Sequence, residues 1–263
     1  MAVRLMPYKV SAFGLSDVGL IRQNNEDVWA EIPELFFYAL ADGMGGHQAG
    51  EVAAHEAVNS LCKIVSQSWG KSNEIEKLHD ARKTLSSAIE QVNGTVFKIS
   101  RTDPTLKGMG TTLCCIYLHE KGLVYGYVGD SRIYRHRKRK LEQLSKDHSL
   151  FREMVDLGQI SEKQGPEFLY KNIITKAIGT EPKVTPTVHL GDIKAGDTYL
   201  LCTDGLSDLL SSKEIQNIMN QEMSVEDTAR ELVATANARG GHDNVTVVLV
   251  KVLEANEKKG ISR

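Results

Sequence analysis

Groups of apolar strands alternate with pairs of amphipathic helices along this chain, and that order restricts the folds open to it. Residues 111–118 and 123–128 form two apolar strands that a four-residue turn containing Gly122 joins into a hairpin. Further strands are expected at 36–41, 132–135, 197–202 and 245–252. Because hairpins place neighbouring strands antiparallel, this order favours antiparallel sheets over a regularly alternating parallel sheet.

Helix pairs are expected to cover these sheets. Residues 51–65 and 75–99 carry apolar side chains at intervals of three or four positions, which gives each helix an apolar face. Two later helices are indicated by the capping residues Ser211 and Ser224, each with an acidic residue three positions further on. The sequence therefore predicts an α+β fold in which helices pack on antiparallel sheets.

The composition is that of an ordinary globular protein, the length fits one large domain or two small ones, and no linker divides the chain. Of the 263 residues, 41% are hydrophobic and 25% charged, and the net charge of −2 gives no indication of nucleic-acid binding. No apolar run approaches the roughly 20 residues that span a bilayer, and the N-terminus lacks the apolar core of a signal peptide. We expect a single domain over residues 1–253, followed by a short polar tail over 254–263.

The four cysteines, at positions 62, 114, 115 and 202, are not spaced like the pairs of a zinc site. The adjacent Cys114 and Cys115 would point to opposite faces of their strand. We therefore expect reduced thiols that pack as small apolar side chains, and a cytoplasmic protein.

Aspartates stand where the apolar strands begin or end. Asp42, Asp130 and Asp204 each follow a strand, and Asp243 comes just before the last one. Any one of them could simply form a turn, because Asp-Gly is a common turn pair. If the four meet at one end of the sheets, a divalent cation would relieve their repulsion and lost hydration. Oxygen ligands without His or Cys favour Mg²⁺ or Mn²⁺.

Residues 41–51 place four glycines just before a helix. Such a segment allows a ligand to approach the backbone closely and favours anions at the helix N-terminus, although glycine-rich turns also simply begin helices. The spacing matches neither the dinucleotide-binding nor the Walker motif.

Eight short blocks follow one another over nearly the whole chain. They are GLIRQNNED at 19–27, ADGMGGHQAGE at 41–51, MGTT at 109–112, VGDSR at 128–132, DHS at 147–149, ITKAIG at 174–179, LCTDGLSD at 201–208 and GHDNVT at 241–246. In this order they resemble the bacterial PP2C-type (PPM) metal-dependent protein serine/threonine phosphatases. The resemblance implies a four-layer α-β-β-α sandwich, two mainly antiparallel sheets flanked by helix pairs, with a two-metal centre at one end.

The resemblance also implies a set of metal ligands. Asp42 would bridge two Mn²⁺ or Mg²⁺ ions, the Gly43 carbonyl would bind one of them, and Asp204 and Asp243 would bind the other. Asp130 matches a residue that helps to hold a weaker third ion in bacterial members, although an aspartate that caps a turn and pairs with a neighbouring arginine is the alternative. A hydroxide bridging the two ions would attack phosphorus.

Four further residues have roles implied by the resemblance. Glu26 and Asp27 would hold metal-bound waters. Arg22 would bind the substrate phosphate, with a surface ion pair to Glu26 or Asp27 as the alternative. His47 is the nearest match to a histidine beside the phosphate and is a candidate general acid; its alternative role is a hydrogen bond at the helix entry.

Two departures from the family pattern concern the surroundings of the metals. Met44 stands where eukaryotic relatives carry a histidine. Residues 149–172 correspond to a flap over the site, and 167–172 differ from the His-Pro-x-Arg-Asn run of many bacterial members. Asp147 and His148 are expected to be structural, and the basic run at 135–140 is expected to be a solvated hairpin turn.

Three functional hypotheses follow. The first is a protein phosphatase that reverses a cognate serine/threonine kinase, acts on phosphorylated proteins as a monomer, and binds neither nucleic acid nor membranes. The second is a metal-dependent phosphodiesterase or nuclease, which the near-neutral charge disfavours. The third is an inactive module that binds a partner, which the complete set of aspartates disfavours.

Overall fold

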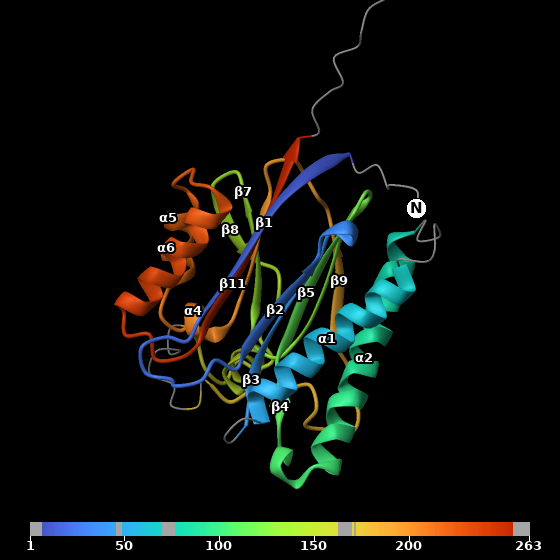
Figure 1. Ribbon diagram of the computed structural model, residues 1–263. Coiled ribbons are helices and arrows are strands. Elements are labelled where there is room, and N and C mark those ends of the chain that lie inside the picture. Colours follow the sequence, from blue (N-terminus) through green and yellow to red (C-terminus); the bar gives the residue numbers. More distant parts are fainter. Residues whose placement is uncertain (1–6, 46–48, 70–76, 163–169, 171, 255–263) are drawn as a thin grey trace, which may run out of the picture.

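The computed structural model describes residues 7–45, 49–69, 77–162, 170 and 172–254. In these residues the chain forms two sheets that pack face to face, with helices on both outer faces (Figure 1). Every strand pairing in the described part is antiparallel. The four-layer α-β-β-α sandwich expected from the sequence is confirmed.

The first sheet has five strands in the order β1, β11, β10, β7, β8. Their bounds are Tyr8–Asp17, Val245–Glu254, Thr198–Cys202, Arg132–Arg137 and Lys140–Gln143. The second sheet has the order β2, β3, β5, β6, β9, and the short β4 also pairs with β3. Their bounds are Asp27–Ile32, Phe37–Met44, Leu113–His119, Gly122–Val128, Thr187–Gly191 and, for β4, Gly110–Thr111.

One helix pair lies on each outer face (Figure 1). The pair on the second sheet is α1 (Ala49–Trp69) and α2 (Leu78–Thr102). The pair on the first sheet is α5 (Ser212–Met219) and α6 (Val225–Ala238). Within the described residues, four shorter helices occupy the connections: η1 (Pro33–Leu35), η2 (Pro104–Leu106), α3 (Leu150–Asp156) and α4 (Asp204–Ser207). None of the helices in the described segments is long and apolar enough to cross a membrane.

Three buried apolar clusters hold the layers together. One joins α1 and α2 to the second sheet, one lies between the sheets, and one joins α5 and α6 to the first sheet. The adjacent cysteines separate as expected, because Cys115 belongs to the first of these clusters and Cys114 to the second. All four thiols are free.

Four strands are absent from the sequence-based prediction, namely β1, β2, β8 and β9. They are the two edge strands of each sheet. Most of their residues are half-buried or exposed, whereas the central β5 is buried along its whole length. Edge strands therefore lack the continuous apolar run on which the prediction relied.

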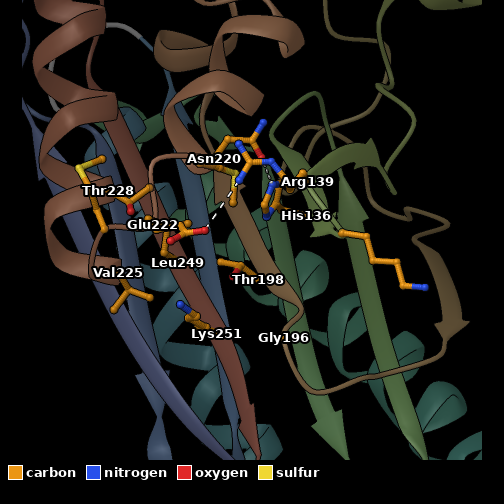
Figure 2. Close-up of a pocket in the computed structure, with 13 residues that line it drawn as sticks. His136, Arg139, Gly196, Thr198, Asn220, Glu222, Val225, Thr228, Leu249 and Lys251 are labelled. Atoms are coloured by element: carbon orange, nitrogen blue, oxygen red, sulfur yellow. Dashed lines mark hydrogen bonds and ion pairs between the residues drawn. The ribbon is translucent and has the colours of Figure 1, made fainter.

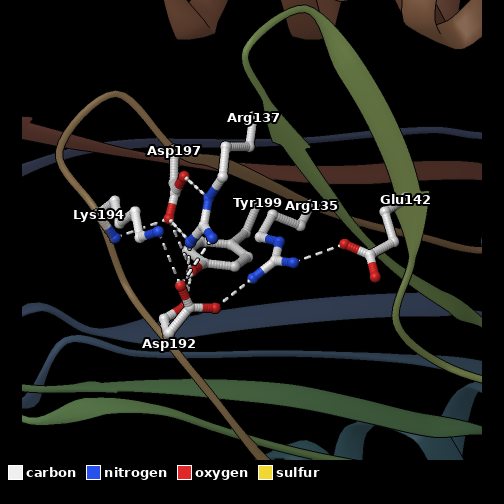
Figure 3. A network of polar contacts seen from close by, with 7 residues as sticks. All are labelled: Arg135, Arg137, Glu142, Asp192, Lys194, Asp197 and Tyr199. Atoms are coloured by element: carbon white, nitrogen blue, oxygen red, sulfur yellow. Dashed lines mark hydrogen bonds and ion pairs between the residues drawn. The ribbon is translucent and has the colours of Figure 1, made fainter.

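The basic run at 135–140 is a hairpin between β7 and β8, as expected, but it is only partly solvated. Lys138 and Arg139 form the turn, with φ of 51° and 63°. Arg135 and Arg137 instead make ion pairs with acidic side chains, including 2.6 Å from Arg137 Nε to Asp197 Oδ1 (Figure 3). These pairs fasten the hairpin to the connection between β9 and β10.

Two expected segment boundaries can be compared with the structure. The last strand runs to Glu254, so the strand includes the first residue assigned to the polar tail, and 255–263 lie outside the described residues. In the expected flap, Ser149 caps α3 and pairs with Ile174, while 163–169 and 171 lie outside the described residues.

Candidate functional site

The strand ends bring the predicted aspartates to one end of the sandwich. In the pairing of β2 with β3, Asp27 lies opposite Asp42. Thr203, which precedes Asp204 at the end of β10, donates from Oγ1 to Asp27 Oδ2 at 2.9 Å. This hydrogen bond joins the two sheets, because Asp27 belongs to the second sheet and β10 to the first.

Asn244 fixes the N-terminal part of the site to the start of β11. Its Oδ1 accepts a hydrogen bond from the Glu26 amide at 2.8 Å, and its Nδ2 donates to the carbonyls of Val18 and Asn24. The segment that carries Arg22 and Glu26 is thereby held beside Asp243. Sequence reasoning gave Asn244 and Thr203 no role, although both stand in the family-like blocks next to a predicted ligand.

The carboxyl groups gathered here have strongly raised pKa values. Burial raises the pKa of Asp27 and of Asp130 to about 7, and that of Asp204 to about 6, with repulsion from neighbouring carboxylates adding to each. Burial is the largest cause that raises the pKa of Asp42 well above its ordinary value, and repulsion from the nearby aspartates is the next. Burial also raises the pKa of Glu26. The site therefore disfavours its own negative charge and favours a bound cation.

Two of these carboxyl groups have an oxygen without a partner. Asp27 Oδ1 and Asp130 Oδ1 are buried and accept no hydrogen bond from the described residues. An unpaired buried oxygen is unfavourable unless another group binds it. Arg132 does not supply that partner for Asp130, since its guanidinium binds Asp147, with Nη2 at 2.7 Å from Oδ2.

Hydrogen bonds through His148 stabilise the turn that carries Asp130. The Gly129 amide donates to His148 Nδ1 at 3.1 Å, and His148 Nε2 donates to Thr187 Oγ1 at 3.0 Å. Burial lowers the pKa of His148 to about 4, so the imidazole is neutral near pH 7. His148 and Asp147 thus have the structural contacts expected from the sequence.

Gly43 has no room for a side chain. A Cβ there would lie 2.2 Å from the Gly50 carbonyl oxygen and 2.8 Å from that of Glu26. The glycine thereby lets the end of β3 lie against the first turn of α1 and the backbone of Glu26. Because Gly43 directly follows Asp42, its backbone carbonyl lies next to the carboxylate cluster.

Arg22 lies at the open side of the carboxylate cluster. Its Nη2 is 2.7 Å from Asp243 Oδ2, and its side chain is 55% exposed. The alternative ion pair with Glu26 or Asp27 is therefore not the one that forms. Arg22 also lines a surface hollow together with Ile21, Glu26, Gly45 and Asn244.

The predicted metal ligands are not all grouped around one point in this structure. Among the described residues, no three His, Cys, Asp or Glu side chains are grouped so that they could hold a metal ion as they stand. Asp42 and Asp204 are in contact, whereas Asp243 binds Arg22. Met44 ends β3 beside the site, and His47 lies outside the described residues.

Comparison with known families identifies this arrangement. A family model described as protein phosphatase 2C matches residues 18–254. The chain belongs to the protein phosphatase 2C family. The match spans all eight sequence blocks and every strand of both sheets except β1, so the PP2C resemblance inferred from the sequence is confirmed.

Named relatives of this PP2C chain are phosphatases of bacteria. The serine/threonine phosphatase stp of Listeria monocytogenes is 34% identical over 239 residues, which are 90% of this chain and 93% of the relative. The protein phosphatase PhpP of Streptococcus pneumoniae is 34% identical over 243 residues, 91% of this chain and 96% of the relative. The chain is accordingly a serine/threonine phosphatase of the PP2C type.

Solved PP2C structures share the fold. The serine/threonine phosphatase PstP/Ppp of Mycobacterium tuberculosis superposes with a TM-score of 0.84 at 35% identity, covering 94% of this chain and 99% of the other. A structure of the PstP catalytic domain in complex with two manganese ions superposes with a TM-score of 0.81 at 35% identity, covering 93% and 98%.

Proposed function

We propose that this PP2C phosphatase hydrolyses phosphoserine and phosphothreonine in proteins with two bound Mn²⁺ or Mg²⁺ ions, and so reverses the action of a serine/threonine kinase. The observation that carries the proposal is the concentration of five aspartates at one end of the sandwich, four of them with raised pKa values. The manganese complex of a relative 35% identical to this chain supports the choice of cation.

The donor set fits hard divalent cations. Carboxylate and carbonyl oxygens are the ligands that Mg²⁺ and Mn²⁺ prefer. Asp42, the Gly43 carbonyl, Asp204 and Asp243 would hold two ions, and Asp130, with its unpartnered Oδ1, would help to hold a third. Two such ions, when bound, would supply a hydroxide for in-line attack on phosphorus and neutralise developing charge.

Glu26 and Asp27 would not bind the ions directly but would hold water molecules next to them. Asp27 is held by Thr203 and keeps its Oδ1 free, so it can accept a hydrogen bond from water at the site. Glu26 lies against the first turn of α1, where a Cβ at Gly50 would be 2.0 Å from its Oε2. Both residues would orient water rather than bind the substrate.

Arg22 would bind and orient the phosphate. Its planar guanidinium can donate to two phosphate oxygens at once, and its position beside the cluster places it at the entrance of the site. If Asp243 were to hold a cation, Arg22 would lose its present partner. The guanidinium is then available to the substrate.

The proton for the leaving serine or threonine oxygen is proposed to come from His47. A general acid is needed for an alkyl leaving group and much less for a nitrophenolate. His47→Gln should therefore slow hydrolysis of a phosphothreonine peptide more than hydrolysis of p-nitrophenyl phosphate. Equal slowing of both substrates would contradict the role.

The proposed function is tested with p-nitrophenyl phosphate, a phosphothreonine peptide and plasmid DNA. We expect hydrolysis of the first two with Mn²⁺, its loss in EDTA or in Asp204→Ala, and no cleavage of DNA. Full activity of Asp204→Ala in EDTA would contradict the metal mechanism. Cleavage of DNA alone would favour the nuclease hypothesis, and no turnover at all would favour the binding module. The monomeric state and the cytoplasmic location stay predictions from the sequence.

A further inference from the structure

A second hollow lies at the opposite end of the first sheet from the carboxylate cluster. It opens where the connection between α5 and α6 leaves the outer face of β7, β10 and β11 uncovered (Figure 2). The cluster lies at the beginning of β7 and β11 and at the end of β10, whereas this hollow involves their other ends. It encloses about 700 Å³, counting space open to solvent.

Three paired residues form the floor of this hollow. Thr198 of β10 lies opposite His136 of β7 and opposite Lys251 of β11, so the three side chains form a row on one face of the sheet. His136 Nε2 donates to Asn220 Oδ1 at 2.9 Å, which fixes the imidazole at one side. Figure 2 shows Thr198 between the other two residues.

The charges of the hollow are mainly positive. Lys138, Arg139 and Lys251 line it, against one acidic residue, Glu222. Arg139 and Glu222 are 3.8 Å apart and both are well exposed, so this pair is weak. Lys251 is half-buried, and its ammonium group makes no ion pair or hydrogen bond with the described residues. An anion would therefore find unpaired positive charge here, on a chain whose net charge is −2.

The turn that presents two of these cations is unfavourable for the backbone. Two-residue hairpin turns with positive φ at both positions usually contain Asn-Gly, whereas here Lys138 and Arg139 have φ of 51° and 63°. This left-handed conformation is unfavourable for residues with a side chain. The turn thus places Arg139 at the hollow in a backbone conformation that is unfavourable for its side chain.

Apolar side chains of β11 and of the segment around the α5–α6 connection also line the hollow. They are Met219, Met223, Val225 and Leu249. Methionine side chains adapt to differently shaped apolar groups. The hollow therefore offers an adaptable apolar surface beside positive charge, and its open rim would not enclose a small molecule as typical ligand pockets do.

We infer that this hollow is a docking site for an acidic peptide segment carrying an apolar side chain, located on the phosphoprotein substrates of the enzyme. The carboxylates would contact Lys251 and Arg139, and the apolar side chain would pack on the methionines. The inference rests on the proposed function, because it assigns the segment to the substrate. No bond is formed or broken at this site.

The position of the hollow sets a length for the substrate. His136, in β7, stands six positions after Asp130, which corresponds to about 20 Å of extended chain at 3.3 Å per residue. An extended peptide spans at most ~3.5 Å per residue. The acidic segment must therefore stand at least about six residues from the phosphorylated residue to reach the hollow while that residue is at the metal centre.

Binding is measured first, without catalysis. A fluorescein-labelled, unphosphorylated peptide with three glutamates around one leucine is titrated with the whole protein and followed by anisotropy. We expect binding that weakens with salt, and a Kd at least about fivefold higher for Lys251→Glu and for Arg139→Glu. Lys213→Glu, an exposed residue of α5 outside the hollow, makes the same charge change and should leave Kd unaltered. Equal weakening in all three variants would overturn the site.

Kinetics then connect the hollow to the substrate. Phosphothreonine peptides carry the acidic segment three, eight or twelve residues from the phosphothreonine. We expect a lower KM for the two longer spacings only, lost in Lys251→Gln, with p-nitrophenyl phosphate turnover and the melting temperature unchanged. A KM that is independent of spacing while p-nitrophenyl phosphate is hydrolysed would overturn the docking site alone. Failure to hydrolyse p-nitrophenyl phosphate would instead contradict the proposed function. Displacement of the labelled peptide by equimolar inorganic phosphate would identify a small-anion site and overturn the peptide assignment.

Discussion

Asp42 combines an unfavourable charge with an essential position. Burial and the neighbouring aspartates raise its pKa well above the ordinary value, so its ionised form is destabilised in the metal-free protein. An amide of the same shape removes that charge and also removes a proposed bridging ligand. Stability and activity are therefore expected to change in opposite directions at this residue.

Asp42→Asn tests this opposition. In EDTA we expect a melting temperature at least ~2 °C above that of the wild type, because repulsion is lost. With Mn²⁺ we expect activity on p-nitrophenyl phosphate to fall more than about 100-fold, since loss of even an outer partner of a metal site costs 10–100-fold. Asp80→Asn, at an exposed position of α2, is the control and should change neither quantity. A lower melting temperature of Asp42→Asn in EDTA would show that charge repulsion is not the main effect of Asp42 on the stability of the fold.

Arg22 provides a second test at this scale. Arg22→Ala should raise KM for a phosphothreonine peptide by about tenfold or more, the value of a charge-assisted hydrogen-bond pair. The free energy of unfolding should change by less than about 1 kcal/mol, because the ion pair with Asp243 is exposed. Arg22→Lys keeps the charge but cannot donate two parallel hydrogen bonds to the phosphate. Its KM is expected to lie between those of the wild type and Arg22→Ala. An unchanged KM in the alanine variant would remove Arg22 from phosphate binding.

The sequence identifies the acidic residues of this site but not their partners. Asp42, Asp204 and Asp243 could be singled out because each adjoins a recognisable strand or motif. The pairing of Arg22 with Asp243 spans 221 positions, and that of Thr203 with Asp27 spans 176. Such contacts depend on how the sheets are placed relative to each other, which local patterns do not encode.

At the scale of elements, the central strands are predictable and the edge strands are not. The six expected strands correspond to β3, the β4–β5 segment, β6, β7, β10 and β11, none of which is an edge strand. The segment at 111–118 is divided at Thr112, whose Oγ1 binds the Asp42 amide and the Ser131 hydroxyl. That division results from contacts to distant residues, so the apolar pattern continues through it.

Helix capping was predictable because it is local, and α5 allows a direct test. Ser211 accepts from the Glu214 amide, and Glu214 accepts from the Ser211 amide at 2.9 Å, completing a capping box. Ser211→Ala should lower the free energy of unfolding by about 1 kcal/mol. Ser212→Ala, one position further on and exposed, should change it by less than about 0.5 kcal/mol. Equal effects in urea unfolding would contradict the capping role.

At the scale of the whole molecule, the packing of the four layers predicts how the cysteines react. Cys114, Cys115 and Cys202 are buried, and burial raises the pKa of each thiol. Burial raises the pKa of the less enclosed Cys62 to about 11. In a thiol-titration assay at pH 8, we expect at most slow reaction of Cys62 in the native protein and reaction of all four thiols in urea. Fast reaction of a second thiol in the native protein would show that a helix layer or a sheet separates easily from its neighbour.

The carboxylate cluster spans both sheets, so its titration should affect the stability of the entire fold. The pKa values of Asp27 and Asp130, about 7, and of Asp204, about 6, lie above the ordinary value of 3.8. The folded protein therefore binds more protons than the unfolded chain between about pH 4 and pH 7. Their contribution to stability is complete below pH 4 and is lost as the pH rises through 6 and 7. His148, with a pKa lowered to about 4, acts in the opposite sense below pH 6.5, but it is one group against three.

In EDTA we therefore expect the melting temperature to fall as the pH is raised from 5.5 to 7.5. Asp192 and Glu214, whose pKa values are lowered to about 2, titrate below this window and do not contribute to the change. Saturating Mn²⁺ should abolish or reverse the fall, because the cations bind the ionised carboxylates. Asp27→Asn should reduce the slope in EDTA, whereas Asp80→Asn should leave it unchanged. A melting temperature that rises with pH in EDTA would mean that these aspartates are already ionised near pH 5, and the electrostatic basis of the site would be wrong.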